Sequence, residues 1–287
     1  MSNATFLRAS EVVTPGLRVF WASRVDARQV APSMLRDMTE TEPKSQGRRP
    51  RKSRAKAAVV RRPLWRRMLR WLSRGVLVIA AFYAALILLF AVVPPPTNIY
   101  QMQESWRLGG IERDWVVWDD IAPVMARSVV ASEDANFCNH WGFDMAAIRL
   151  ALDEGEGRGA STLTQQVVKN VYLWHGRNWL RKGMEALLTP VVELVWTKRR
   201  ILHVYLNEAE FDEGVFGVQA AAQHFFGVDA MDLTAQQAAR LAAVLPDPKG
   251  RDAGKPGPYV RRRGARVMDG AETIKADGRA SCFESSE

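Results

Sequence analysis

The uninterrupted apolar stretch Gly75–Val93, GVLVIAAFYAALILLFAVV, decides the architecture of this 287-residue chain. Its 19 residues carry no charge. As a helix rising about 1.5 Å per residue they reach roughly 28 Å, close to the hydrocarbon thickness of a bilayer. A cleaved signal peptide would stand at the extreme N-terminus, with a shorter apolar core and an A-x-A-like cleavage site. Here the run follows 74 residues and ends in Pro94-Pro95-Pro96. We therefore predict an uncleaved transmembrane helix over 75–93.

A block of positive charge lies directly before this run and argues against a buried core helix at 75–93. Between Arg48 and Arg74 twelve residues are Lys or Arg and none is acidic, so of the net charge of +9 the rest of the chain keeps −3. The high sequence pI of about 9.9 is therefore due to this one basic segment. The partner expected for that segment is anionic lipid rather than nucleic acid. Because such blocks stay in the cytoplasm, we expect the N-terminus inside and everything after Pro94 outside.

Composition divides the chain into five segments. We expect a basic, disordered cytoplasmic tail, the transmembrane helix, a linker, a globular domain and a C-terminal tail, at 1–74, 75–93, 94–110, 111–267 and 268–287. Within the first segment, Leu64–Arg74 alternates Trp, Leu and Met with Arg at helical spacing, which suits the headgroup level of a membrane. The two cysteines, Cys138 and Cys282, are far apart in the sequence. The compartment outside the membrane would permit a disulfide bond, but two cysteines do not make a disulfide framework, so we predict no disulfide bond.

The outer domain is expected to be predominantly helical. Residues 97–120 look extended or irregular, and the apolar stretch from Val124 to Val130 should bury one face of a helix. The apolar periodicity predicts further helices at 144–152, 161–173, 180–196, 199–207, 215–226 and 234–245. Glycines separate many of these segments, and none of the sequence alternates strongly in the manner of a strand.

The first segment that could carry chemistry is EDANFCNHWGFD at 133–144. Glu133 should stand at or near the C-terminal end of its helix, where the helix dipole disfavours a carboxylate and so suits it to act as a base. Glu133 and Asp134 can equally be surface acids, with His140 a loop histidine, because one acid alone is weak evidence of catalysis. His140 and Asp144 could also be metal ligands, but no Cys or His cluster accompanies them.

The second segment is GASTLTQQVVKN at 159–170. On a helix, one half of its circumference is polar and is made by Ser161, Thr162, Gln165, Gln166, Lys169 and Asn170. A merely solvated face is normally rich in Glu, Lys and Arg, whereas hydroxyls and amides around one Lys suit phosphate and sugar hydroxyls. Ser161 can also cap the helix without any ligand. The spacing is not that of a P-loop.

The third segment is RKGME at 181–185, in which Arg181 and Glu185 are four residues apart. Taken alone, such a pair is most often an exposed ion pair worth about 0.3–0.5 kcal/mol. The segment KRRILHVYLN at 198–207 and the small residues between Gly214 and Gly227 are interpreted as scaffold.

Taken in this order, these segments resemble the family-51 glycosyltransferases, which polymerise peptidoglycan and also form one domain of bifunctional penicillin-binding proteins. The matching motifs are E-D-x-x-F-x-x-H-x-G-x-D at 133–144, G-x-S-T-x-T-Q-Q-x-x-K-N at 159–170, R-K-x-x-E at 181–185, K-x-x-I-L-x-x-Y-L-N at 198–207 and G-x-x-G-x-x-x-A-A-x-x-F-F-G at 214–227. The resemblance runs from about Ile111 to about Val267. No Ser-x-x-Lys transpeptidase module follows, so the chain resembles the monofunctional members. It departs from them at His203 and Gln237, where Glu is usual, and at Arg240, in a normally apolar stretch.

The resemblance implies a mainly α, lysozyme-like domain with a small membrane-facing lobe, for which we expect Trp174, Trp179 and Leu180 to contribute. It implies an enzyme that polymerises lipid II into β-1,4-linked glycan strands and releases undecaprenyl diphosphate. The expected location is the cell inner membrane, single-pass, with the N-terminus cytoplasmic and the catalytic domain periplasmic. The implied partners are lipid II, the growing strand, the membrane and proteins of cell-wall synthesis or division, with no nucleic acid.

The same resemblance assigns roles to the site residues. Glu133 would be the general base for the acceptor 4-hydroxyl, and inversion at the anomeric carbon would need no covalent enzyme intermediate. Lys169 and Arg181 would neutralise the leaving diphosphate, while Glu185 would orient these cations or a divalent ion. The phosphate and sugar would be held by Asp134, Ser161, Thr162, Gln165, Gln166 and Asn170. No cofactor is required by the sequence, and Mg²⁺ or Mn²⁺ near Glu185 is the one candidate.

Two other functions stay open at this point. A lytic glycosidase would use a Glu acid in an open groove and would need neither diphosphate-binding cations nor a lipid-facing lobe. Lys169, Arg181 and the membrane anchor speak against it. An inactive scaffold that recruits other wall-building proteins would be favoured by an altered first motif, yet Glu133 and Asp134 are both present.

Overall fold

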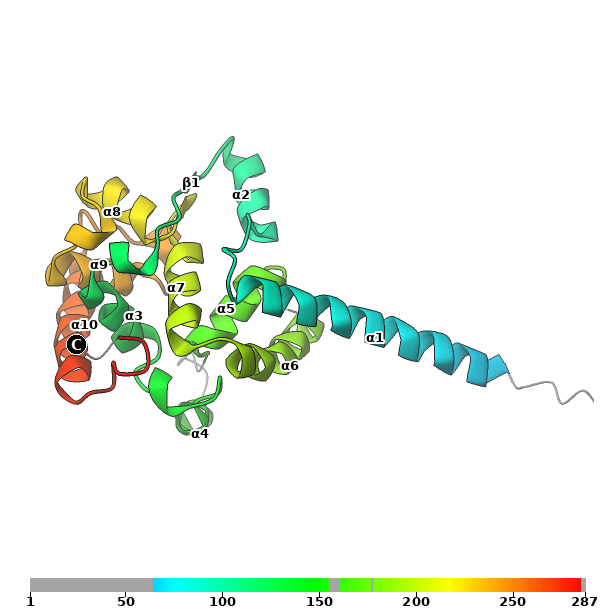
Figure 1. Cartoon of the computed structure of the whole chain (residues 1–287). Helices are drawn as coiled ribbons and strands as arrows, with labels where there is room; N and C mark the ends of the chain where they lie inside the picture. Colours follow the sequence, from blue (N-terminus) through cyan, green and yellow to red (C-terminus); the bar gives the residue numbers. More distant parts are fainter. Residues whose placement is uncertain (1–63, 155–160, 177, 285–287) are drawn as a thin grey trace, which may run out of the picture. The chain divides into compact units, whose positions relative to one another are not determined.

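The computed structural model in Figure 1 describes residues 64–154, 161–176 and 178–284. By its contacts the chain falls into two units, 1–60 and 61–287, and all described residues belong to the second. Most of the expected cytoplasmic tail, Gly159 and Ala160 of the second polar segment, and the last three residues lie outside the described residues.

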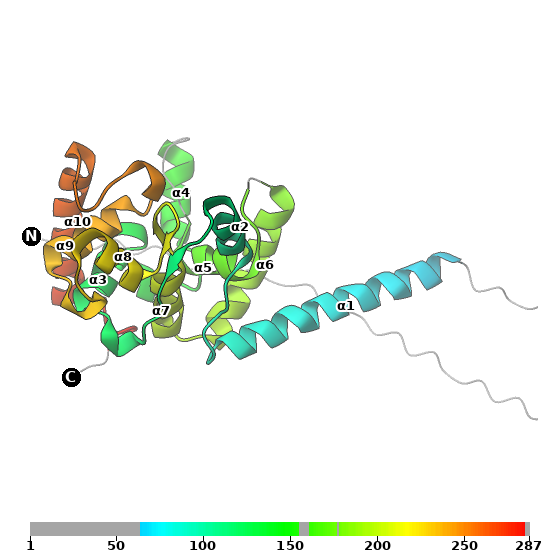
Figure 2. The same ribbon diagram turned by 90° about the horizontal axis from the view of Figure 1, so that it is seen from above.

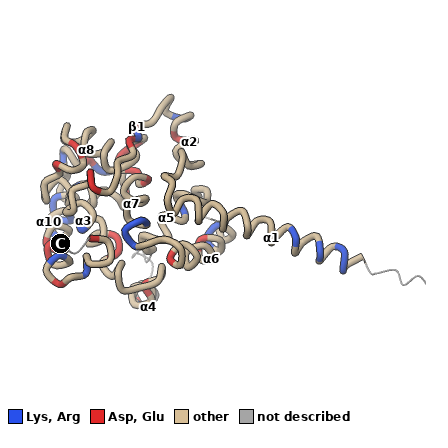
Figure 3. The backbone as a smooth tube through the Cα atoms, in the orientation of Figure 1, with Lys and Arg blue, Asp and Glu red and all other residues tan. Residues whose placement is uncertain are grey.

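The membrane anchor is helix α1, Leu64–Phe90, which joins the amphipathic segment and the apolar run into one helix of 27 residues. It is long and apolar enough to cross a membrane, reaching about 40 Å at 1.5 Å per residue. Figure 3 shows its Lys and Arg gathered at the end far from the domain. Only Ile87 and Phe90 of this helix are buried. The helix ends three residues before the predicted end of the span, and its last residues turn toward the domain.

The C-terminal end of α1 is held by two side chains at the corner between helices α6 (Trp179–Val195) and α7 (Lys198–Glu208). Trp196 Nε1 donates to the Ile87 carbonyl at 2.7 Å. Arg200 donates to the carbonyls of Phe90, at 3.0 and 2.8 Å, and of Val93, at 2.7 Å. The last carbonyls of a helix need partners from outside it, which Arg200 supplies to Phe90, and a cation also suits the negative end of the helix dipole. The anchor is therefore fixed to the domain and not merely tethered to it.

The domain is mainly α, as the sequence predicted. Its other helices are α2 (Ile99–Leu108), α3 (Pro123–Glu133), α4 (Met145–Glu154), α5 (Leu163–Tyr172), α8 (Val218–Phe226), α9 (Ala235–Val244) and α10 (Pro258–Ala276). Short 3₁₀ turns lie at Trp118–Asp120, Phe137–Asn139, Ala230–Asp232 and Pro248–Gly250. Three strands, β1 (Glu112–Arg113), β2 (Glu210–Asp212) and β3 (Val215–Phe216), form a sheet in the order β1-β3-β2, with β1 parallel and β2 antiparallel to β3.

Three parts of the secondary structure differ from the prediction. The region 97–120 is not irregular throughout, because α2 forms within it behind a capping box of Asn98 and Gln101. The helix predicted from residue 215 begins at Val218, since the two residues of β3 precede it. Helix α10 was not foreseen; it starts at a favourable N-terminal proline, Pro258. The expected boundary between residues 267 and 268 falls inside α10.

Two helix groups make the core, as Figures 1 and 2 show. Helices α3, α9 and α10 pack against one another on one side of the domain, and α5 packs against α6 and α7 on the side of the anchor. The first group buries Met125, Val129, Leu241 and Val267. The second buries Leu163 and Val167 of α5. The C-terminal end of α3 and the N-terminal half of α5 come together where the groups meet.

Cys138 and Cys282 form a disulfide bond, so the prediction of none was wrong. Cysteines 144 residues apart give no spacing signal in the sequence, and only the fold brings their Cα atoms to 5.7 Å. The bond ties the segment after α10 to the turn after α3. Arg127 pairs with Glu284 at 2.6 Å, and Phe283 is buried beside Phe137. The end of the described chain is therefore part of the domain.

Candidate active site

Glu133 is the last residue of α3, as predicted. Its Oε2 accepts a hydrogen bond from Gln166 Nε2 at 3.1 Å, and its Oε1 accepts one from Ser132 Oγ at 3.2 Å. The side chain is mostly buried but keeps some access to solvent, with 13% of its surface exposed. A carboxylate held by two donors, with room for one more partner, is well placed to receive a proton from a bound hydroxyl.

A residue that the sequence analysis missed, Arg263 of α10, lies behind this carboxylate. Its Nη2 is 3.6 Å from Glu133 Oε1 and donates to the Ser132 carbonyl at 3.2 Å and to Ser132 Oγ at 3.0 Å. The guanidinium thus lies beside the Glu133 carboxylate and fixes its neighbour Ser132. Arg263 is one of three consecutive arginines, so no spacing distinguishes it in the sequence.

Asp134 is buried and both its oxygens are engaged by the protein itself. Oδ2 accepts from the backbone N–H of Leu163, at the start of α5, at 3.0 Å, and Oδ1 lies 2.8 Å from His140 Nε2. A carboxylate at a helix N-terminus is favoured by the helix dipole. Asp134 therefore joins the end of α3 to the beginning of α5, which is a positioning contact rather than a free ligand for substrate.

His140 and Asp144 do not act together. Asp144 accepts from the backbone N–H groups of Ala146 and Ala147, both at 2.9 Å, and from Asn136. The pKa of Asp144 is lowered by these hydrogen bonds. Each side chain thus organises its own loop.

The predicted polar half of α5 divides into two parts. Thr162, not Ser161, is the N-cap, and it forms a capping box with Gln165 in which both side chains are buried. Thr162 Oγ1 also donates to the Gly142 carbonyl at 2.7 Å. Gly142 has φ of 76°, and a Cβ there would come within 2.5 Å of Thr189 Cγ2, so only glycine fits. These residues shape the start of the helix, and Ser161 is exposed.

The second part, Gln166, Lys169 and Asn170, faces a hollow of about 200 Å³. Tyr100 of α2 and His175 line another side of it and stack with their ring centroids 3.8 Å apart. Gln166 lies between this hollow and Glu133, because its amide nitrogen bonds Glu133 while its oxygen lies 3.4 Å from Tyr205 Oη. Burial raises the pKa of Tyr205 well above its usual value, which keeps the hydroxyl a donor. The polar face of α5 thus meets both the carboxylate and the hollow.

Arg181 and Glu185 are not the exposed ion pair that spacing alone favours. Glu185 is buried, and Arg181 Nη1 lies 2.7 Å from its Oε2 while Lys182 bonds its Oε1. Arg181 Nε also donates to the Gly176 carbonyl at 2.9 Å. A second hollow, of about 320 Å³, is lined by Asn178, Trp179, Arg181 and Lys182. One buried carboxylate therefore holds two cations at the edge of an open space.

Lys169 lies between the two groups of charges. Burial lowers its pKa, and the nearby cations Arg181 and Lys182 act in the same direction, while the carboxylates Glu185 and Glu133 oppose the shift. Lys169 stands three residues after Gln166, so the two side chains are neighbours on one helix face, about 5–6 Å apart at Cβ. Glu133, through its bond with Gln166, and Lys169 therefore meet the same face of α5.

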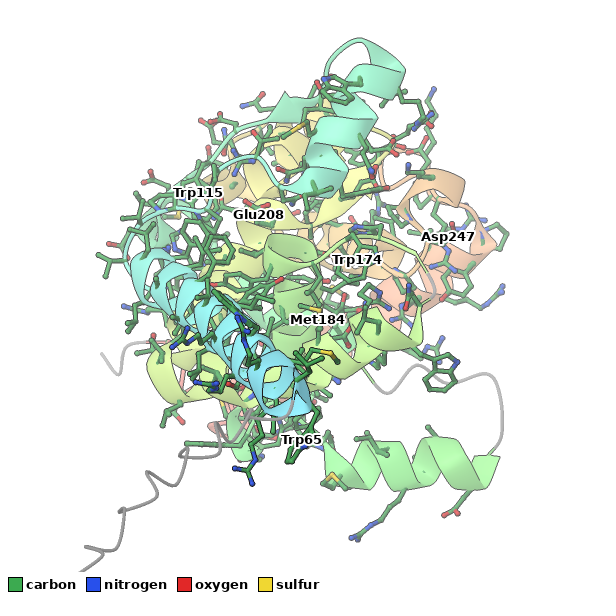
Figure 4. The ribbon with its side chains drawn as sticks, turned by 90° about the vertical axis from the view of Figure 1, so that its right-hand side faces the viewer. Trp65, Trp115, Trp174, Met184, Glu208 and Asp247 are labelled. Carbon is green, nitrogen blue, oxygen red and sulfur yellow. A yellow bond between two sulfur atoms is a disulfide. The ribbon has the colours of Figure 1, made fainter. Side chains whose placement is uncertain are left out.

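The residues suggested for a membrane-facing lobe do not behave alike. Trp179 and Leu180 at the start of α6 are 92% and 66% exposed. Trp174 instead packs against the core, and Figure 4 shows it near Met184, well inside the outline of the domain. Leu187 and Leu194 extend the exposed apolar surface along α6.

The residues near Glu185 do not make a protein-built site for Mg²⁺ or Mn²⁺. Both its carboxylate oxygens already bond cations. Within the described residues, no group of three or more His, Cys, Asp or Glu side chains is arranged to hold a metal ion. A divalent ion needs several oxygen ligands, and the Glu185 carboxylate leaves none free.

Comparison with known proteins gives one consistent result. The family model described as transglycosylase matches residues 100–272. The chain is 63% identical over 216 residues to the biosynthetic peptidoglycan transglycosylase of Jannaschia sp. (strain CCS1), covering 75% of this chain and 90% of that protein. It is 52% identical over 206 residues to the protein of that name from Pseudomonas entomophila (strain L48), covering 68% and 87%. The corresponding protein of Pseudomonas fluorescens (strain SBW25) is 47% identical over 225 residues, covering 74% and 94%.

Proposed function

Because the chain belongs to the transglycosylase family, it is a peptidoglycan glycosyltransferase, and we propose that Glu133 is its general base and Lys169 its principal cation. The reaction joins lipid II into β-1,4-linked glycan strands and releases undecaprenyl diphosphate. One observation carries the assignment. The polar face of α5 bonds Glu133 through Gln166, and about one turn further along the same helix Lys169 lies near the charges of Arg181 and Glu185.

The carboxylate would act on the acceptor sugar. The acceptor 4-hydroxyl loses its proton to Glu133 as its oxygen attacks the anomeric carbon of the donor, and the bond from that carbon to the diphosphate breaks. This single displacement converts an α-linked diphosphate into a β-linked sugar and needs one base, not a nucleophilic carboxylate. Gln166, Ser132 and Arg263 would hold the carboxylate in the orientation that this transfer requires.

The cations would act on the leaving group. Negative charge builds on the diphosphate as its bond to the sugar breaks, and preorganised cations stabilise that charge most where water is largely excluded. Lys169 is partly buried, and Arg181 is held in place by Glu185 and by the Gly176 carbonyl. Glu185 would thus position the cations, which is the role that its two ion pairs support.

The location that we propose is the cell inner membrane, crossed once by α1, with the catalytic domain in the periplasm. The basic end of α1 would stay in the cytoplasm. The exposed apolar residues of α6 would lie in the outer leaflet near the prenyl chain. An oxidising compartment also suits the disulfide bond. Cell-wall synthesis or division proteins are the partners that this location offers.

The test uses the full chain in detergent or nanodiscs with labelled lipid II. We expect the native protein to produce long glycan and Glu133→Gln to lower the rate by about 10²- to 10⁴-fold, the usual contribution of a general base. Glu272→Gln on the exposed side of α10 is the matched control and should retain the native rate. The melting temperatures of all three proteins should agree.

Normal polymerisation by Glu133→Gln would remove the base assignment. Release of muropeptides from finished cell wall, without turnover of lipid II, would indicate a lytic enzyme. A folded native protein with neither activity would indicate a scaffold.

A further inference from the structure

Helix α2 carries an apolar stripe that nothing covers within the described part of the chain. Ile99, Met102 and Trp106 lie at positions i, i+3 and i+7 and are 52%, 44% and 80% exposed. These spacings place the three side chains along one face of the helix. A surface helix of a soluble domain turns such a face inward, so this stripe indicates a partner outside the chain.

The opposite face of α2 attaches the helix to the domain through polar groups. Gln101 and the N-cap Asn98 donate to Glu208 Oε2 of α7, at 3.0 and 2.8 Å. Glu104 accepts from Lys249 at 2.9 Å. Gln101 and Glu104 are both buried. The orientation of α2 is therefore set by specific bonds that hold the apolar stripe away from the domain.

Because the polar face of α2 bonds Glu208 and Lys249, the stripe lies on the face of α2 turned away from these partners. In Figures 1 and 2 α2 runs across the direction of α1. The start of α7 meets the end of α1 through Arg200, and the last residue of α7, Glu208, bonds α2. Only eight residues separate Phe90 from Ile99, and the Pro95 carbonyl within them is held by Arg113 at 3.0 Å. With α1 crossing a bilayer, α2 then lies along the outer surface of that bilayer.

We propose that α2 is a second membrane-contacting element, with Ile99, Met102 and Trp106 inserted at the boundary between headgroups and acyl chains of the outer leaflet. Helices α1 and α6, which carry further exposed apolar residues, lie toward the same side of the domain as α2 in Figure 1, so α2 adds to an apolar surface next to the anchor. Trp106 is of the residue type that favours this boundary. Because α1 keeps α2 at the membrane, a small inserted area is enough for a lasting contact.

This contact would also fix one edge of the site, an inference that rests on the proposed function. Tyr100, on the same helix, lines the hollow beside Lys169 and stacks on His175. Insertion of α2 therefore holds the hollow at the depth of a lipid-linked diphosphate. Helix α6, with Trp179 exposed beside Arg181, forms the other edge.

Depth measurements on the full chain test the contact directly. The protein carries an NBD probe on Met102→Cys, is reconstituted into phosphatidylethanolamine–phosphatidylglycerol vesicles with its disulfide intact, and is quenched by nitroxide lipids of defined depth. Leu77→Cys in α1 reports the anchor, and Gln236→Cys, exposed on α9, is the control away from the membrane. We expect a blue-shifted Met102 probe quenched best by shallow nitroxides, a Leu77 probe quenched by deep ones and an unquenched Gln236 probe.

A Met102 probe that behaves like the Gln236 probe, while the Leu77 probe is quenched, overturns the inference and leaves the anchor and the enzymatic function intact. An unquenched Leu77 probe overturns both the anchor and the inference. Concentration-dependent crosslinking of the unlabelled Met102→Cys protein by a bis-maleimide, together with no quenching of the labelled protein, shows that a second copy covers the stripe and also overturns the inference.

A kinetic test separates membrane contact from folding. The combined variant Ile99→Ser, Met102→Ser and Trp106→Ser should raise the KM for lipid II in vesicles several-fold and leave the rate in detergent solution unchanged. Met231→Ser, which removes another exposed apolar side chain, is the matched control and should change neither. Equal KM values for the combined variant and the native protein in vesicles contradict the inference.

Discussion

The two sides of the site are built differently. The carboxylate side consists of Glu133, Ser132 and Arg263, on helices α3 and α10, whose mutual packing makes the larger core. The cation side consists of Lys169, Arg181, Lys182 and Glu185, on helices α5 and α6, next to the anchor and the exposed apolar surface. The Cys138–Cys282 bond lies behind the first and has no counterpart among the described residues behind the second.

The difference follows from what each side must do. Proton transfer depends on placement to within a fraction of an ångström, so a base needs a rigid setting. Stabilising a diphosphate depends on charge, which acts over longer distances than a proton transfer does. The cation side can therefore lie at the mobile boundary with lipid, where the prenyl chain of the substrate must enter and leave. Substitutions can weaken the rigid setting of Glu133 and remove the charge of Lys169 separately, so the comparison can be tested.

The largest effect after loss of the base should come from the cation side. Lys169→Met should lower the rate constant of polymerisation by about 10²- to 10³-fold, the loss typical of one preorganised transition-state contact. Lys275→Met, exposed at the end of α10, is the control and should retain the native rate. Single-turnover measurements with saturating lipid II provide the comparison. A near-native rate for Lys169→Met would show that another cation stabilises the leaving diphosphate.

The same lysine predicts a pH dependence. Its pKa is lowered chiefly by burial, so Lys169 loses its proton at a lower pH than an ordinary lysine does. As pH rises through that lowered pKa, the diphosphate loses its cation and the rate should fall. The alkaline limb of the rate profile should be absent from the residual activity of Lys169→Met. An unchanged limb in that variant would mean that another group titrates there.

Opening the disulfide should affect the carboxylate side. The variant with Cys138→Ser and Cys282→Ser should lose about 2–4 kcal/mol of the free energy of unfolding, because the bond closes a long loop. Urea unfolding of the two proteins measures this, and reduction of the native protein should lower its stability to a similar value. The rate of polymerisation should also be lower in the variant than in the native protein, because Cys138 lies only five residues after Glu133. Equal stabilities of native and variant protein would show that the other contacts of Phe283 and Glu284 suffice.

Arg263 offers a smaller and more specific change. Arg263→Met should lower the rate about tenfold, with KM for lipid II nearly unchanged, because a slightly misplaced base slows the chemical step. Arg263→Lys should restore part of the rate, since it keeps the positive charge near Glu133. A larger change in KM than in kcat, or no difference between the two variants, would assign Arg263 a merely structural role.

The smallest effect concerns His175 on the far edge of the hollow. Burial, with help from Lys169 and Arg181, lowers the pKa of His175 from 6.5 to about 4. Between these values the unfolded chain binds more protons than the folded one, so stability is lost as pH falls from 6.5 toward 4. The melting temperature of the variant His175→Asn should depend less on pH over this range than that of the native protein. An unchanged slope would place the titration elsewhere.

Local patterns in the sequence located Glu133 at the end of α3 and the polar residues of α5. They could not show which of those residues are already engaged. Asp134, Thr162 and Gln165 bond groups within the protein. The partners Leu163 of Asp134 and Gly142 of Thr162 become neighbours only through folding. The pairing of Arg263 with Glu133 spans 130 residues and leaves no local trace.

Helix α2 was missed for a definite physical reason. Its buried positions hold Gln101 and Glu104, which are paired with Glu208 and Lys249, while its apolar residues face outward. A method that assigns apolar residues to the interior cannot recognise such a helix. The strands escaped because each has only two or three residues, too few for an alternating pattern.

The division of labour between the two sides is tested most directly by equilibrium binding of undecaprenyl diphosphate to the protein in nanodiscs, without an acceptor. The account predicts that Glu133→Gln binds this product at least as tightly as the native protein, while Lys169→Met binds it more than tenfold more weakly, since a charge-assisted phosphate contact is lost. Weakened binding in Glu133→Gln, or native binding in Lys169→Met, would contradict the separation of base and cations on which the account depends.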